Sequence, residues 1–233
     1  MEQQFDKLHV LLPVVHLVEA DFHKTIKNIT VAMKEGADGI FLIGHSMLPE
    51  FVIEHYEKVR EKWPDLWIGI NFLRSSNEEA IEWISKTEAQ ALWLDDAGFR
   101  DDNKDSCEDV KDIRFWQKQY QCESVMIFGG VAFKYQEQPK SPAGAAILTA
   151  QYVDVVTTSG IGTGEAAQKE KIEFMKLALG TNPLGLASGI TPENVQEYLP
   201  YVKYFLVSTG ISFPKGDDFD ITRIRALVKN MQT

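Results

Sequence analysis

Four residues of this sequence carry side chains suited to proton transfer or to the handling of charge. His16, His45 and Asp95 each end a short apolar run, and Lys134 lies just beyond a fourth run. A histidine with its usual pKa of about 6.5 suits general acid–base catalysis, and a positioned carboxylate can take part in the same proton transfer. We therefore predict His16, His45, Asp95 and Lys134 as catalytic residues.

Other interpretations of these residues stay open. Each histidine also suits a structural hydrogen bond, and a metal ion is the third choice. Metal-binding spacings such as His-X-His and His-Glu-X-X-His do not occur in the sequence. We therefore predict neither a metal nor another cofactor. Lys134 suits a phosphate ligand, an electrostatic stabiliser, a Schiff-base amine or a solvated surface residue. Asp95 and Asp96 point to opposite sides of an extended chain, so we expect one to reach a site and the other to serve in a cap or turn.

Two stretches late in the sequence have the composition of phosphate-binding loops. Ser188 to Asn194 follows the apolar run 183–187 and opens a helical pattern, with Thr191 as the expected N-cap. Gly210 ends a second apolar run in the same manner, after Ser208 and Thr209. Backbone N–H groups and hydroxyls at such strand ends can hold an anion, although each stretch taken singly is also an ordinary turn.

Further ligand contacts are predicted at two earlier places. The segment Ser159 to Gly164 is dense in glycine, which suits a mobile lid or the close approach of a ligand. Arg74 follows Asn71 closely and offers a bidentate anion contact, with a surface salt bridge as the alternative. The predicted substrate- or phosphate-binding residues are Asn71, Arg74, Ser159, Gly160, Gly162, Thr163, Ser188, Gly189, Thr191, Asn194, Ser208, Thr209 and Gly210.

The elements that must position these residues alternate regularly. Apolar runs of strand length begin near His9, Asp38, Leu66, Ala91, Ser124, Val153, Pro183 and Tyr204. Amphipathic helical patterns cover residues 25–35, 49–62, 78–86, 109–120, 143–151, 166–179, 191–199 and 221–231. Near-continuous apolar strands are typical of a sheet buried on both faces, and β and α units that alternate eight times favour a closed (β/α)8 barrel over an open doubly wound sheet. We expect one barrel domain over residues 1–233, with its site at the carboxyl ends of the strands.

Composition narrows the class of protein further. The 233 residues carry a formal net charge of −10 without a Lys/Arg-rich block, which argues against nucleic acid or an anionic membrane as the main partner. Cys107 and Cys122 make neither a disulfide framework nor a zinc pattern, and the first residues lack the order of a signal peptide, so we expect a cytoplasmic protein. No apolar run is long enough to span a bilayer. Trp63 and Trp83, if exposed, would suit a contact surface in a homo-oligomer.

Several motifs, in the same order and over nearly the whole chain, resemble the BtpA family of TIM-barrel proteins. They are Val14-Val-His-Leu, Gly36-Ala-Asp-Gly-Ile, Gly69-Ile-Asn-Phe-Leu-Arg, Ala132-Phe-Lys, Ser159-Gly-Ile-Gly-Thr-Gly, Ala187-Ser-Gly-Ile-Thr-Pro-Glu-Asn-Val and Asp220-Ile-Thr-Arg-Ile-Arg-Ala-Leu-Val. The resemblance implies a single barrel related to phosphate-binding barrels. It implies no settled biochemistry, since members are linked to photosystem I assembly or to sugar metabolism.

The sequence departs from that family at two strand ends, as a divergent member would. Gly44-His45 stands where the family usually has an acidic residue followed by Asn, and Ser208-Thr-Gly-Ile-Ser212 stands where it usually has Gly-Thr-Ser-Leu-Lys. The lysine of that second loop is therefore missing, although Lys215 lies close enough in the chain to substitute for it.

Two functional hypotheses follow. The first is an enzyme acting on a sugar phosphate or phosphoribosyl compound, of isomerase, lyase or phosphoribosyl-transfer type, with the phosphate held by the loops after the seventh and eighth strands. The second is a non-catalytic BtpA-like binding or assembly factor on the same scaffold, which the altered eighth loop favours.

Overall fold

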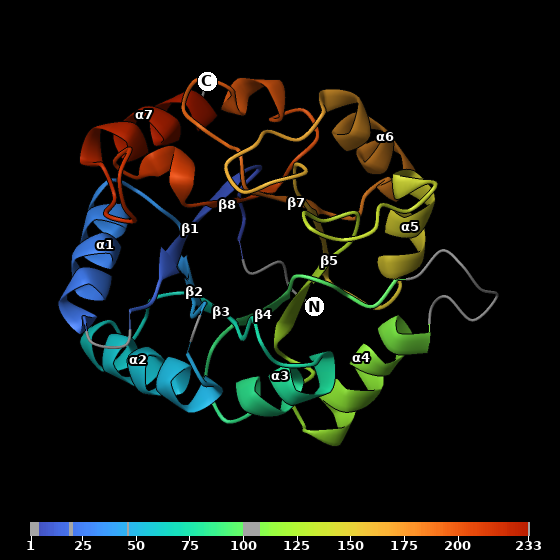
Figure 1. Ribbon diagram of the computed structural model, residues 1–233, viewed down its shortest axis with the longest axis horizontal. Helices are drawn as coiled ribbons and strands as arrows, with labels where there is room; N and C mark the ends of the chain where they lie inside the picture. The colour runs from blue at the N-terminus through green and yellow to red at the C-terminus, as the bar shows by residue number, and fades with distance from the viewer. Residues whose placement is uncertain (1–4, 19–20, 46, 100–107, 233) are drawn as a thin grey trace.

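Eight parallel strands close into a barrel, and helices form a ring around it (Figure 1). The computed structural model describes residues 5–18, 21–45, 47–99 and 108–232. The strands are β1 Val10–His16, β2 Ile40–Ile43, β3 Ile68–Asn71, β4 Ala91–Leu94, β5 Met126–Gly130, β6 Val155–Thr158, β7 Leu184–Ala187 and β8 Tyr204–Val207. Each strand pairs with its neighbour in sequence, and β1 pairs with β8 in the register Val10↔Tyr204. The predicted (β/α)8 barrel is confirmed.

The α-helices of the described residues follow all strands but β7. They are α1 Phe22–Lys34, α2 Pro49–Lys62, α3 Asn77–Ile84, α4 Glu108–Gln119, α5 Pro142–Thr149, α6 Lys169–Leu179 and α7 Ile221–Met231. Side chains cap two of these helices. The Ser76 hydroxyl accepts the Glu79 N–H while the Glu79 carboxylate accepts the Ser76 N–H, and Pro142 occupies the first turn of α5 behind the Ser141 cap.

The prediction of a helix over residues 191–199, the seventh of the eight, is wrong. The segment forms only a short 3-10 helix, η1 Val195–Glu197, and a second one, η2 Thr209–Ile211, follows β8. Thr191 is therefore not the N-cap of an α-helix: its N–H binds the Asn194 side chain, and its hydroxyl accepts the Glu193 N–H. The Asn194 side chain competes with a helix here, because it accepts the Thr191 N–H and donates to the carbonyl of Gly189.

Alternation along the strands separates two cores. On β1, Leu11 and Val15 belong to the layer between strands and helices, whereas Val10, Leu12 and Val14 belong to the cluster inside the barrel. Aromatic rings fill the barrel interior; the centroids of Phe41 and Phe128 are 5.2 Å apart, and those of Phe128 and Tyr204 are 5.1 Å apart. These rings pack the interior of the barrel, and the cavity described below lies above them, at the carboxyl ends of the strands.

A glycine makes that interior packing possible. A Cβ built on Gly69 would lie 2.2 Å from the ring of Phe41 on the adjacent strand, which no side chain tolerates. The small residue on β3 therefore makes room for the large one on β2, the complementarity by which a small barrel is filled.

Candidate active site

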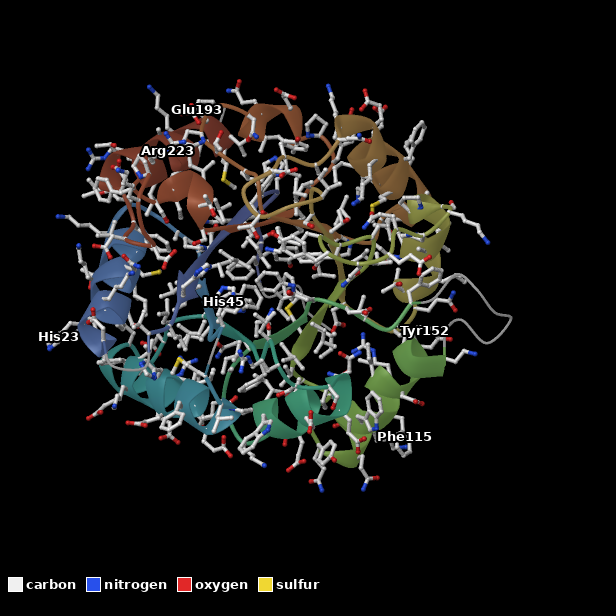
Figure 2. The ribbon with its side chains drawn as sticks, viewed as in Figure 1. His23, His45, Phe115, Tyr152, Glu193 and Arg223 are labelled. Atoms are coloured by element: carbon white, nitrogen blue, oxygen red, sulfur yellow. The ribbon has the colours of Figure 1, made fainter. Side chains whose placement is uncertain are left out.

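A cavity of about 200 Å³ opens at the carboxyl ends of the strands. Figure 2 shows His45 inside the ring of helices, while His23 lies on its outer surface. Side chains from β1, β2, β4 and β8 and from the loops after β2 to β8 line the cavity: Val14, His16, Ile43, His45, Leu73, Trp93, Asp95, Lys134, Tyr135, Thr163, Ser188, Leu206, Ser208 and Thr209. All four predicted catalytic residues line it, as do four of the predicted ligand-binding residues.

Two histidine rings face each other at the ends of β1 and β2. The centroids of His16 and His45 are 4.7 Å apart, and His16 Nδ1 lies 3.7 Å from Asp217 Oδ1. Burial and, to a smaller extent, the neighbouring His45 lower the pKa of His16 to about 4, although Asp217 acts in the opposite direction. His16 is therefore neutral at physiological pH, so one ring nitrogen can donate a hydrogen bond and the other can accept one.

A buried carboxyl group follows β4. Asp95 Oδ1 accepts a hydrogen bond of 2.9 Å from the side chain of Asn71, which is buried at the end of β3. Burial raises the pKa of Asp95, against the effect of the Asn71 hydrogen bond and of Lys134. Asp96 turns the other way and accepts the N–H of Gly98, as a turn residue does. Asp95 thus lines the cavity while Asp96 serves a turn, as alternation along an extended chain predicts.

Lys134 lies in a tightly held loop after β5. Its N–H donates to the Ser159 hydroxyl, and its Nζ lies 3.4 Å from Thr163 Oγ1. On the other side of the loop, the Gln136 amide donates to the carbonyl of Asp95 at 2.7 Å. The loop is thus tied to both neighbouring strand ends, and the lysine side chain lines the cavity instead of the outer surface.

Hydroxyl groups line the side of the cavity next to Lys134. Thr163 comes from the loop after β6, Ser188 from the end of β7, and Ser208 and Thr209 from the end of β8. The Ser188 hydroxyl already accepts the N–H of Gly164 at 2.8 Å, which joins the loops after β6 and β7. Together with the lysine ammonium, these groups form a side of the cavity suited to an anion.

The predicted phosphate-loop glycines are packed against the chain itself. A Cβ on Gly160 or Gly189 would lie 2.2 Å or 2.1 Å from the carbonyl oxygen of Glu165, and one on Gly210 would lie 1.8 Å from that of Ile190. Their lack of a side chain is therefore explained by loops that pack on one another. Any contact of these glycines with a ligand would be made by their backbone N–H groups, and their ligand binding stays a prediction.

Six other predicted ligand-binding residues do not line the cavity, and one of them is Thr191, whose turn contacts are given above. The side chain of Asn194 donates to the carbonyl of Gly189 and accepts the N–H of Thr191, so it holds the loop together. Arg74 donates to the carbonyl of His45 at 3.2 Å. The Ser159 hydroxyl accepts the N–H of Lys134 and donates to the carbonyl of Gly160. A Cβ on Gly162 would lie 2.8 Å from the Glu165 carboxylate. The Asn71 side chain donates to Asp95, as described above.

Sequence reasoning missed three residues that shape the cavity. Trp93, on β4, and Tyr135, next to Lys134, both line it. Lys171, on α6, donates to the carbonyls of Ala132 and Ser159 behind the lysine loop, and burial lowers its pKa to about 8. The alternation on β4 could have shown that Trp93 points inward, but nothing in the sequence places Lys171 beneath the loops.

No group of three or more His, Cys, Asp and Glu side chains is arranged to hold a metal ion within the part of the chain that the structure describes. Over the same residues, no helix is both long and apolar enough to cross a membrane. Cys122 is buried and free, and Cys107 lies outside the described residues.

Comparisons with known proteins bear on the fold. No protein-family model matches the chain, and no curated protein matches it. A native KDPGal structure superposes with a TM-score of 0.68 at 11% identity, covering 100% of this chain and 98% of that one. Phosphoribosyl anthranilate isomerase from Thermus thermophilus gives 0.62 at 18% identity, with 96% and 98% covered. The tryptophan synthase alpha subunit from Legionella pneumophila gives 0.65 at 14% identity, with 96% and 93% covered.

At these identities the likeness concerns the fold, and it defines the class of protein. The chain is a TIM-barrel protein with a cavity where such barrels carry their sites. The finer resemblance to the BtpA family finds no support in these comparisons.

Proposed function

We propose that the cavity is the active site of an enzyme that acts on a phosphorylated small molecule, most plausibly a sugar phosphate or a phosphoribosyl compound. The observation that carries the proposal is the division of one small cavity between Lys134 with four hydroxyls and the His16, His45 and Asp95 group. The structural neighbours named phosphoribosyl anthranilate isomerase and tryptophan synthase alpha subunit are enzymes on the same fold, which supports the class without fixing the reaction.

In this proposal the two groups have different tasks. Lys134, Thr163 and the hydroxyls of β7 and β8 bind the phosphate, and this binding energy orients the rest of the substrate. Asp95 moves the proton, because burial brings its pKa closer to neutrality, where a general base or acid is most effective. Neutral His16 donates a hydrogen bond to the substrate oxygen that gains electron density, and His45 lies beside it. Such a set suits an isomerase-like or lyase-like step.

The first experiment measures binding and then proton transfer. Melting temperatures are recorded with inorganic phosphate, sugar phosphates and phosphoribosyl compounds; a ligand at about 100 times its Kd stabilises by about 2.7 kcal/mol. Lys134→Met should abolish most of the shift, whereas Lys118→Met on the outside of α4 should leave it unchanged. Any ester that binds is then incubated in D2O, and NMR follows exchange at its carbon-bound hydrogens.

Asp95→Asn keeps a side chain that can accept the Asn71 hydrogen bond, so it should bind the ester normally and slow the exchange at least about 100-fold. Binding without exchange in the wild type would favour a second function, a BtpA-like binding or assembly factor. The packing of Gly160, Gly189 and Gly210 on the chain's own carbonyls favours that function, because those glycines then need no ligand to explain them.

A further inference from the structure

The floor of the cavity is apolar, and this limits what can bind there. Below the polar groups, the cavity is lined by Val14, Ile43, Leu73, Trp93 and Leu206, and all but Leu73 are fully buried. A bare sugar phosphate carries hydroxyls on most of its carbons and would leave them without hydrogen-bond partners on such a floor. The lining therefore fits a ligand with an apolar group at the end opposite its anion.

The cavity has the size for a single small ring. Its volume is about 200 Å³, and an apolar cavity of about 150 Å³ in another protein admits benzene. The indole of Trp93 lines the cavity from β4 with 4% of the residue exposed, and it packs edge-on against Phe41 and Phe133 with centroids 5.7 Å and 6.1 Å away. These contacts hold the indole in place, so its position is preformed for a planar ligand group.

Tyr135 supplies a second aromatic ring at the rim of the same cavity. Its hydroxyl lies 3.1 Å from Thr163 Oγ1 and accepts the Thr163 N–H at 3.2 Å, so the ring is tied across to the loop after β6. Yet the residue is 78% exposed and has a φ of +61°, a backbone conformation that is unusual for a bulky side chain. Burial within the protein does not offset this strain, and strained residues concentrate at ligand sites.

We propose that the ligand is a phosphate ester that carries an aromatic or similarly flat apolar group, with its ring between Trp93 and Tyr135 and its phosphate at Lys134. The proposal rests on the proposed function for the phosphate half of the ligand. It adds the substrate class, and it assigns Tyr135 as the residue that determines specificity for the ring.

Four probes test it by calorimetric titration: phenyl phosphate, glycerol 3-phosphate, inorganic phosphate and benzyl alcohol. We expect phenyl phosphate to bind at least tenfold more tightly than glycerol 3-phosphate, because only the former covers the apolar floor. Benzyl alcohol, which lacks the anion, should bind at least tenfold more weakly than phenyl phosphate. Lys134→Met should weaken both esters by similar factors.

Variants of Tyr135 separate its ring from its hydroxyl. Tyr135→Asn removes the ring and suits a positive φ, so it should fold normally and lower affinity for phenyl phosphate by about three- to tenfold, with no effect on glycerol 3-phosphate. Tyr135→Phe keeps the ring and should keep the preference within a factor of two. A ring preference that survives in Tyr135→Asn would overturn the role of Tyr135.

The outcomes distinguish the two proposals. If the two esters bind equally, the inference about the ring is wrong and the proposed function stands. If no ester binds, the phosphate site is wrong and both proposals fail. Both also fail if benzyl alcohol binds as tightly as phenyl phosphate and Lys134→Met leaves the affinities of both compounds unchanged.

Discussion

The two halves of the barrel mouth are built differently. The half formed by β1 to β4 holds its polar groups singly at strand ends, His16, His45 and Asp95, and two of them have pKa values shifted by burial. The half formed by β5 to β8 holds Lys134 and hydroxyls on loops that hydrogen-bond to and pack against one another. In the proposed function, the groups assigned to proton transfer lie directly at strand ends, whereas Lys134 and Thr163, assigned to the anion, lie on loops that contact each other.

The largest effect is expected from breaking the loop packing of the β5 to β8 half. In Gly210→Ala the new methyl group would lie 1.8 Å from the carbonyl oxygen of Ile190, so backbone must move. We expect the free energy of unfolding, measured by urea titration, to fall by about 3 kcal/mol or more. Gly144→Ala on α5 is the control: its φ is not positive, and the nearest atom to its Cβ would be the Ser141 hydroxyl oxygen at 3.2 Å, so stability should change by less than about 1 kcal/mol. Equal losses in the two variants would show that the loops are not tightly packed.

The same contrast explains what the sequence could predict. Strand ends were predictable because fully buried strands are apolar throughout, and the carboxyl ends of parallel strands share one rim, which brings His16, His45 and Asp95 together. The glycines were visible, but a sequence does not show which carbonyl approaches each of them. Likewise the periodicity of residues 191–199 resembles a helix, but the Asn194 side chain binds the backbone of Gly189 and Thr191, and only a short 3-10 helix forms. Tyr135 was missed because its exposure and positive φ depend on contacts with Thr163 from another loop.

The second prediction concerns the pH dependence of stability in the β1 to β4 half. The pKa of His16 is about 4 in the folded protein and 6.5 as a reference, so the unfolded chain binds more protons between these values and stability falls as pH falls from about 6.5 towards 4. At pH 5 the loss from this residue amounts to about 2 kcal/mol. Urea titrations at pH 7 and pH 5 should show the loss in the wild type, and His16→Gln should remove most of it.

Two variants check the assignment. His23→Gln, on the outer surface (Figure 2), should retain the wild-type loss. Asp95 acts in the opposite sense, because its raised pKa lets the folded protein take up a proton first, so stability from this group increases as pH falls. Asp95→Asn removes that gain, and its stability should fall more steeply in acid. An unchanged pH dependence in His16→Gln would mean that the buried imidazole is not the cause.

The smallest effect is expected from an arginine that ties the loops of the β5 to β8 half from outside. Arg223 on α7 pairs with Glu193 through both terminal nitrogens, at 3.2 Å and 2.9 Å, and its Nε donates to the carbonyl of Gly210 at 2.7 Å (Figure 2). It thereby joins the loop after β7 to η2. Lysine cannot make this forked contact, so Arg223→Lys should lower the free energy of unfolding by about 1 kcal/mol.

Arg225→Lys is the matched control that shows whether the contacts of Arg223 with Glu193 and Gly210 serve stability alone or also ligand binding. Arg225 lies on the same helix and pairs with Glu35 through two nitrogens at 2.7 Å and 3.0 Å, at the end of α1 and away from the mouth. Both variants should lose similar stability, but only Arg223→Lys should weaken the binding of a phosphate ester, by about two- to threefold, because only Arg223 anchors loops that carry Ser188 and Thr209. If the two variants bind the ester equally well, the contacts of Arg223 stabilise the fold alone. The loops after β5 to β8 would then be held in place by their contacts with one another.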